Sequence, residues 1–123
     1  MPISNRTASD LQHLVPGVVV LSGSFVGNGS SSPTSVSFKG ATVTRAATGR
    51  YSIVLPGKGS NEILFAGAQV LSTSGRTATV RSYTAATRTL VVDVYDLATP
   101  TAQDLTTSDT LFVQVHVKNS SAR

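Results

Sequence analysis

Residues 111–118 read Leu-Phe-Val-Gln-Val-His-Val-Lys, and this short stretch decides the fold class. Aliphatic residues alternate with polar or aromatic ones, so an extended strand here has one apolar face and one mixed face. Residues 89–96 repeat the pattern, with Leu90, Val92 and Val94 on one side and Val91, Asp93 and Tyr95 on the other. A period of two indicates β-strands that are buried on one face.

Turn residues divide the rest of the chain into further short segments. Residues 27–33 and 56–61 are rich in Gly, Asn, Ser and Pro, which predicts exposed loops. The strands expected between the breaks are 18–25, 35–38, 42–45, 51–55, 62–71, 77–83, 89–96 and 111–118. The small apolar residues of 62–71 predict a central strand buried on both faces. This pattern is typical of an all-β sandwich or barrel, and the spacing of about eight strands is close to that of a sandwich. Of these we expect an all-β sandwich that is jelly-roll-like.

The composition favours a hydroxyl-rich β protein over an enzyme. A chain of 123 residues fits one domain. It has no cysteine, which excludes disulfides, thiolate metal sites and cysteine nucleophiles. Charged residues make up 13% of the chain, about half the usual ~25%, and Ser and Thr together exceed a quarter of it.

The charge pattern bears on the partners of the chain. The formal net charge is +4, but no two basic residues are adjacent and no basic run exists. Nucleic-acid modules concentrate positive charge on one face, so we expect no nucleic-acid partner. The longest apolar stretch, around residues 18–21, is far shorter than the ~20 residues that span a bilayer, and no signal-peptide pattern is present. We therefore expect no membrane partner, and assembly in the cytoplasm.

The first sixteen residues differ from the rest of the chain. They show no strand periodicity, and Ser9 could cap one helical turn that ends before Pro16. The sequence predicts an extended N-terminal arm over residues 1–16 and a sandwich domain over residues 17–123. The apolar cluster in the arm is a candidate docking element, and the alternative is that the arm folds over an open end of the sandwich.

No group of residues predicts catalysis, a cofactor or a metal site. His13 and His116 lack a recognisable nucleophile context, and no Gly-x-Ser-x-Gly elbow exists. Asp104 and Asp109 share one loop but lack the dense acidic spacing of a calcium loop. The aromatic residues could line a sugar-binding face, although their alternating positions favour packing; they are Phe25, Phe38, Tyr51, Phe65, Tyr83, Tyr95 and Phe112.

Four segments together carry a resemblance to a known group. They are Gly-Ser-Phe-Val-Gly-Asn-Gly-Ser-Ser-Ser-Pro-Thr at 23–34, Gly-Ala-Thr-Val-Thr-Arg at 40–45, Thr-Gly-Arg-Tyr-Ser-Ile-Val-Leu at 48–55, and Val-Lys-Asn-Ser-Ser at 117–121. In this order they resemble small virion proteins of tailed bacteriophages, among them capsid decoration, or cement, proteins. The match covers about half of the chain, and residues 71–110 match less well.

The resemblance implies a structural protein without enzymatic activity. Its partner would be the major capsid protein, and its place the outer surface of the capsid, where it would stabilise the head. Cement proteins usually sit at symmetry axes as dimers or trimers, so the resemblance implies a homo-oligomer. Arg6, Leu11 and Leu14 of the arm are the expected capsid contacts. The alternatives are a fibre or spike module that binds host glycans, and a tail or head-completion protein.

Overall fold

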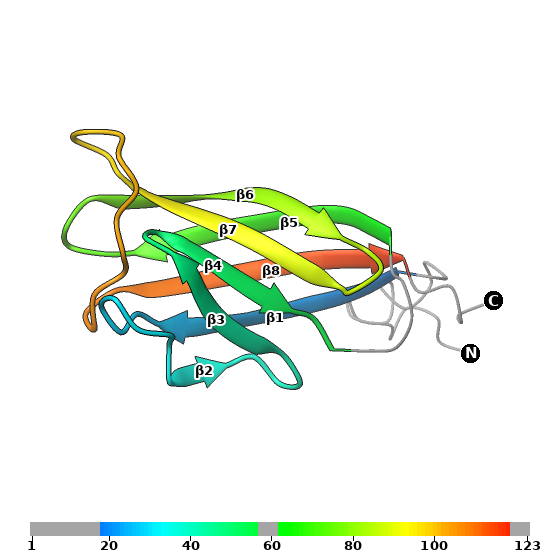
Figure 1. The fold of residues 1–123 in the computed structure, drawn as a ribbon. Helices are drawn as coiled ribbons and strands as arrows, with labels where there is room; N and C mark the ends of the chain where they lie inside the picture. Colours follow the sequence, from blue (N-terminus) through cyan, green and yellow to red (C-terminus); the bar gives the residue numbers. More distant parts are fainter. Residues whose placement is uncertain (1–17, 57–61, 119–123) are drawn as a thin grey trace, which may run out of the picture.

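The protein is an all-β sandwich of two antiparallel four-stranded sheets (Figure 1). The structure is a computed structural model and describes residues 18–56 and 62–118. The strands are β1 (Val18–Val26), β2 (Ser35–Ser37), β3 (Thr42–Ala47), β4 (Arg50–Val54), β5 (Glu62–Leu71), β6 (Arg76–Thr84), β7 (Thr89–Asp96) and β8 (Thr110–Lys118). The predicted sandwich is confirmed.

The strand order gives the topology in detail. The first sheet has the order β2-β1-β8-β5 and the second sheet the order β3-β4-β7-β6. The first and last strands of the chain are therefore neighbours, whereas β3–β4 and β6–β7 are hairpins within the second sheet. The predicted arm at residues 1–16 lies outside the described residues, so this division of the chain stays a prediction.

The alternating residues of the central strands build the core. In β8 the side chains of Leu111, Val113, Val115 and Val117 are buried between the sheets. The second sheet contributes the buried residues Val43, Tyr51, Ile53, Leu90, Val92 and Val94. Burying each large apolar side chain is worth roughly 1.5–3 kcal/mol relative to leaving it exposed, so this layer is the main source of stability.

Strand β5 does not occupy the position that the sequence predicts for residues 62–71. It forms an edge of the first sheet and pairs with β8 alone among the described strands. None of its side chains is fully buried. Small apolar residues resemble a doubly covered strand in sequence, but burial on both faces needs a layer over each face. Within residues 18–56 and 62–118, the second sheet covers one face of the first sheet and no layer covers the other. The prediction of a central strand is wrong.

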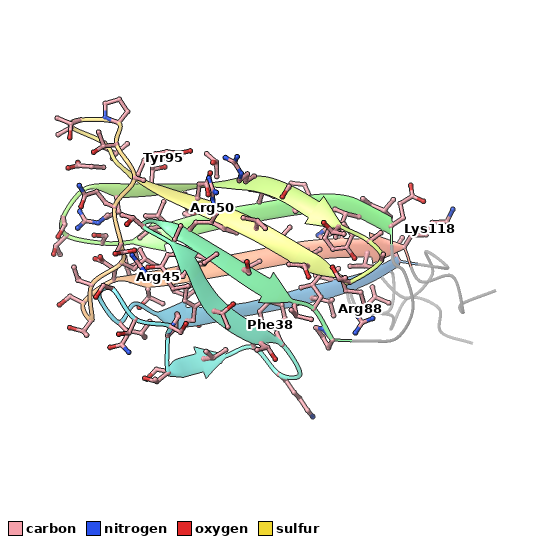
Figure 2. All side chains as sticks on the ribbon, in the orientation of Figure 1. Phe38, Arg45, Arg50, Arg88, Tyr95 and Lys118 are labelled. Carbon is pink, nitrogen blue, oxygen red and sulfur yellow. The ribbon has the colours of Figure 1, made fainter. Side chains whose placement is uncertain are left out.

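The loop over residues 97–109 closes one end of the sandwich, opposite the end that holds Lys118 (Figure 2). The buried Leu105 inserts into the core, and its amide donates a 2.9 Å hydrogen bond to the Tyr51 hydroxyl. The Gly49 amide donates to Asp104 at 2.8 Å. Gly49 has a φ of +67°, and a Cβ there would lie 2.8 Å from the backbone nitrogen of Gln103, so a side chain would displace the loop.

Candidate interaction surface

The candidate interaction surface is the outer face of the first sheet, which is the face that points away from the second sheet and the core. Because β8 buries its odd-numbered residues, its even-numbered side chains point away from the second sheet. The register places β1 on one side of them and β5 on the other. Three cross-strand rows result: Val20–His116–Phe65, Ser22–Gln114–Gly67 and Ser24–Phe112–Gln69.

The middle of this face is hollowed. Ser22, Gly67 and Gln114 form the middle row, and the first two carry little or no side chain. Phe65 and Phe112 lie in the rows above and below and line the same shallow hollow. The ring of Phe65 leans over Gly67, where a Cβ would lie 3.2 Å from its tip. The glycine therefore provides the space in which the ring rests.

Exposed apolar and aromatic side chains share this face with the exposed amides of Gln69 and Gln114. Phe65 is 51% exposed and Phe112 is 47% exposed, and Val20 and Leu71 are also solvent-exposed. The rings of Phe65 and His116 meet edge to face with centroids 5.2 Å apart. A cluster of exposed large side chains on adjacent strands is a feature that marks interaction sites, unlike scattered single ones.

Charge is almost absent from this face. Strands β1, β5 and β8 contribute one carboxylate and one ammonium group, those of Glu62 and Lys118. These two lie 4.0 Å apart at the end of the sheet, and both are mostly exposed. The face can therefore meet an apolar partner without stripping water from a charge in its centre.

The outer face of the second sheet is organised in the opposite way. Its central strand carries Asp93, whose carboxylate accepts hydrogen bonds from Arg50 at 2.9 Å, Arg81 at 3.1 Å and the Tyr95 hydroxyl at 3.2 Å. Figure 2 shows Arg50 and Tyr95 on this side of the molecule. Burial would raise the pKa of Asp93, but the hydrogen bonds from the two arginines outweigh it, and the pKa lies below its ordinary value.

The acidic residues of the 97–109 loop are also engaged by cations. Asp104 accepts hydrogen bonds from the Arg45 guanidinium at 2.8 and 3.0 Å. Asp109 is fully buried, accepts from the Thr106 amide at 2.9 Å and lies 4.0 Å from Arg76. Burial opposes ionisation of both carboxyls, yet hydrogen bonds lower the pKa of each, chiefly from Arg45 for Asp104 and from the Ser72 side chain for Asp109. These carboxylates fix the loop to the sandwich, which favours a structural role over calcium binding.

The residues singled out in the sequence lie in three environments. Phe25, Phe38 and Tyr51 belong to the core, and Tyr83 packs against it, so none of them lines a ligand face. Of the seven aromatic candidates, Phe65 and Phe112 come together on the outer face of the first sheet. Arg6, Leu11, Leu14 and His13 lie outside the described residues, so the predicted contacts in the arm stay predictions.

Sequence reasoning missed the small residues at the centre of this face. The alternation in residues 111–118 does predict that Phe112, Gln114 and His116 share the side opposite the core. It does not give the neighbours of β8, because strand pairing over a long sequence separation leaves no local pattern. Ser22 and Gly67 become recognisable only with the register.

No family model, no curated protein and no solved structure matches this chain. Within residues 18–56 and 62–118, no helix is long and apolar enough to cross a membrane. The same residues hold no group of three or more His, Cys, Asp or Glu side chains arranged to bind a metal ion.

Proposed function

We propose that the chain is a bacteriophage capsid decoration protein that binds the outer surface of the major capsid protein shell and stabilises the head. The observation that carries the proposal is the apolar, nearly uncharged outer face of the first sheet, with Phe65 and Phe112 half-exposed around a hollow. The order of the segments at 23–34, 40–45, 48–55 and 117–121, which resembles that of small virion proteins, supports the choice of partner.

The energetics of this face suit repeated docking of a small domain. Burying a phenylalanine side chain completely is worth about 1.5–3 kcal/mol, so covering the exposed half of one ring contributes roughly 1 kcal/mol before the cost of association. Two rings and the neighbouring valine and leucine supply the apolar centre of an interface. The net charge of +4 accelerates encounter with an acidic shell.

The N-terminal arm is the second contact of the proposal. Arg6, Leu11 and Leu14 would anchor the arm in the shell, while the sandwich covers the junction between neighbouring subunits. The arm precedes β1, which begins at Val18 at the end of the first sheet. Both contacts can therefore be tested independently on one molecule.

The test uses particles whose gene for this chain has been deleted. Purified wild-type protein, Phe65→Ala/Phe112→Ala, a chain lacking residues 1–15, and Leu97→Ala are added, and bound protein is measured after sedimentation. Leu97 serves as a control because it is an exposed aliphatic residue outside the strands of the first sheet, 65% accessible in the 97–109 loop. We expect wild type and Leu97→Ala to restore occupancy and resistance to heating, and the double variant to lose at least tenfold in affinity.

Equal binding by the double variant would contradict the role of the outer face, and equal binding by the truncated chain would contradict the role of the arm. Failure of the wild-type protein to bind the shell would contradict the proposed function itself.

A second candidate is a fibre or spike module that binds host glycans. The specific observation is that Phe65 and Phe112 flank a hollow that also contains the amides of Gln69 and Gln114. Aromatic rings beside amide groups can stack on a sugar ring and hydrogen-bond its hydroxyls. Binding of the isolated protein to a glycan array, lost in Phe112→Ala, would favour this candidate. A tail or head-completion protein would instead form rings that particle imaging reveals.

A further inference from the structure

The four edge strands of the sandwich differ in how they are protected. Among the described strands, the edges are β2 and β5 in the first sheet, and β3 and β6 in the second. An edge strand exposes unpaired backbone groups, so soluble proteins keep it short, charge it, or interrupt it with a bulge. Comparing the four edges therefore shows where another strand can add.

Three of the edges carry such protection. Strand β2 has only 3 residues. Strand β3 contains Arg45 and a register shift beside it. Strand β6 contains Arg76 and Arg81, and its pairing with β7 shifts at Arg81. Each of these edges is therefore a poor template for a further strand.

The fourth edge, β5, is the exception. It is the longest strand, with 10 residues, and its single charged residue is Glu62 at the very start. Its irregularity lies near the beginning, between Ile63 and Phe65. From Phe65 to Leu71 the strand is in continuous register with β8 and contains neither charge nor proline. This edge is a long, neutral and regular template.

The side chains beside this edge are incompletely covered. Ala66, Ala68 and Val70 point toward the core, yet all three stay partly exposed. On the same side of the sandwich, the inward-facing Ala78 and Val80 of β6 are also only partly buried. The core is thus incompletely covered along the β5–β6 side.

We infer that β5 pairs antiparallel with β5 of a second copy of this chain, which joins the two first sheets into one continuous eight-stranded sheet. A strand can meet its own copy only if it does not place like charges together. In an antiparallel pair the two Glu62 side chains lie at opposite ends, about 30 Å apart at ~3.4 Å per residue. The central Ala66-Gly67-Ala68 segment brings no bulk to the axis.

The dimer also extends the surface described above. A pairing centred on Gly67 places Phe65 of each copy opposite Gln69 of the other and doubles the outer face of the first sheet. This pairing does not require a capsid, and it can be measured in the absence of particles. Its failure is therefore distinguishable from failure of the proposed function.

The test is sedimentation velocity of the full chain from about 1 μM to about 1 mM, the concentration range in which moderate association is visible. Gly67→Lys and Gln69→Lys place ammonium groups near the axis of the proposed pair. Thr79→Lys is the matched control because Thr79 is an exposed residue of the other long edge, β6. Circular dichroism and melting show whether each variant is folded.

We expect the wild-type protein and Thr79→Lys to reach a dimer, and both β5 variants to stay folded and shift the dissociation constant upward by at least tenfold. Hydrogen exchange should slow at residues 65–71 as the concentration of the wild-type protein rises, while β6 is unchanged. A wild-type monomer at every concentration, a trimer, or an unchanged dimer in both folded β5 variants would overturn the inference. If hydrogen exchange at β5 slows only when the protein is bound to particles, the edge pairs with a strand of the shell, and the inferred dimer is overturned as well.

Discussion

The outer faces of the two sheets use the same strand geometry for opposite purposes. The central strand of the second sheet places Asp93 among two arginines and a tyrosine, and all three donate hydrogen bonds to its carboxylate. The central strand of the first sheet places Phe112, Gln114 and His116 toward solvent, with aromatic and small residues beside them. A face whose polar groups are satisfied internally stabilises the fold, whereas an apolar face without charges is available to a partner.

Among the residues on the two outer faces, the largest effect on stability is expected at Asp93. Asp93→Ala should lower the free energy of unfolding by about 2 kcal/mol, because it removes the acceptor for Arg50, Arg81 and Tyr95. Gln114→Ala is the matched control, since Gln114 occupies the outer face of the other sheet's central strand. It should change stability by no more than about 0.5 kcal/mol. Urea unfolding measures both, and equal effects would contradict the contrast between the faces.

Acid should weaken the contacts made by Asp93, Asp104 and Asp109. The pKa values of Asp93, Asp104 and Asp109 lie below their ordinary values in the folded protein. The unfolded chain, with carboxyl pKa values near ~4, therefore binds more protons in acid. Their stabilising contribution is fully present above about pH 5 and declines as the pH falls through the lowered folded-state values. Asp93→Asn should make the free energy of unfolding, measured by urea titration, fall less steeply with decreasing pH. A fall as steep as that of the wild type would contradict the contribution of Asp93.

The aromatic residues of the first sheet should matter little for folding. Phe65→Ala and Phe112→Ala each remove a ring that is already about half-exposed, so we expect a loss of about 1 kcal/mol or less. A buried Phe→Ala change costs about 3–5 kcal/mol, and Phe25→Ala in the core serves as that reference. Thermal unfolding of the three variants tests the difference. A loss at Phe112 as large as at Phe25 would show that this ring is structural.

The smallest effect is expected from the exposed ion pair of the first sheet. Glu62 and Lys118 lie 4.0 Å apart and are largely solvent-exposed. Water and salt screen such a pair, so Glu62→Gln should leave the unfolding midpoint unchanged at physiological salt. A measurable fall in the unfolding midpoint that disappears at high salt would show that this ion pair stabilises the fold despite its exposure.

The fold could largely be predicted from the sequence because its central strands are amphipathic. The alternation at Leu90–Val94 and Leu111–Val117 identified the buried side of β7 and β8 correctly. The segments rich in Gly, Asn, Ser and Pro were also correctly predicted to separate strands, because turn formation depends on local residues. For β5, the small apolar residues indicated burial without showing which layers were available, so the prediction of a central strand failed.

The candidate surface could be predicted only in part. Phe112, Gln114 and His116 follow from the period of one strand. Their neighbours Phe65 and Gly67 come from a strand more than forty residues earlier, and nothing local specifies that pairing. The partners of Asp93 are equally remote, because Arg50 reaches it across a strand pair. The local pattern of residues therefore does not show which distant strands pair or how they align.

Cryo-electron microscopy of the virus particles that carry this chain tests the central claim most directly. The account predicts sandwich-shaped density on the outside of the capsid, with the outer face of the first sheet, including Phe65 and Phe112, toward the shell. Density confined to the tail or fibres would contradict the proposed function. Capsid density in which the face carrying Asp93 meets the shell, and Phe112 faces solvent, would contradict the assignment of the interaction surface.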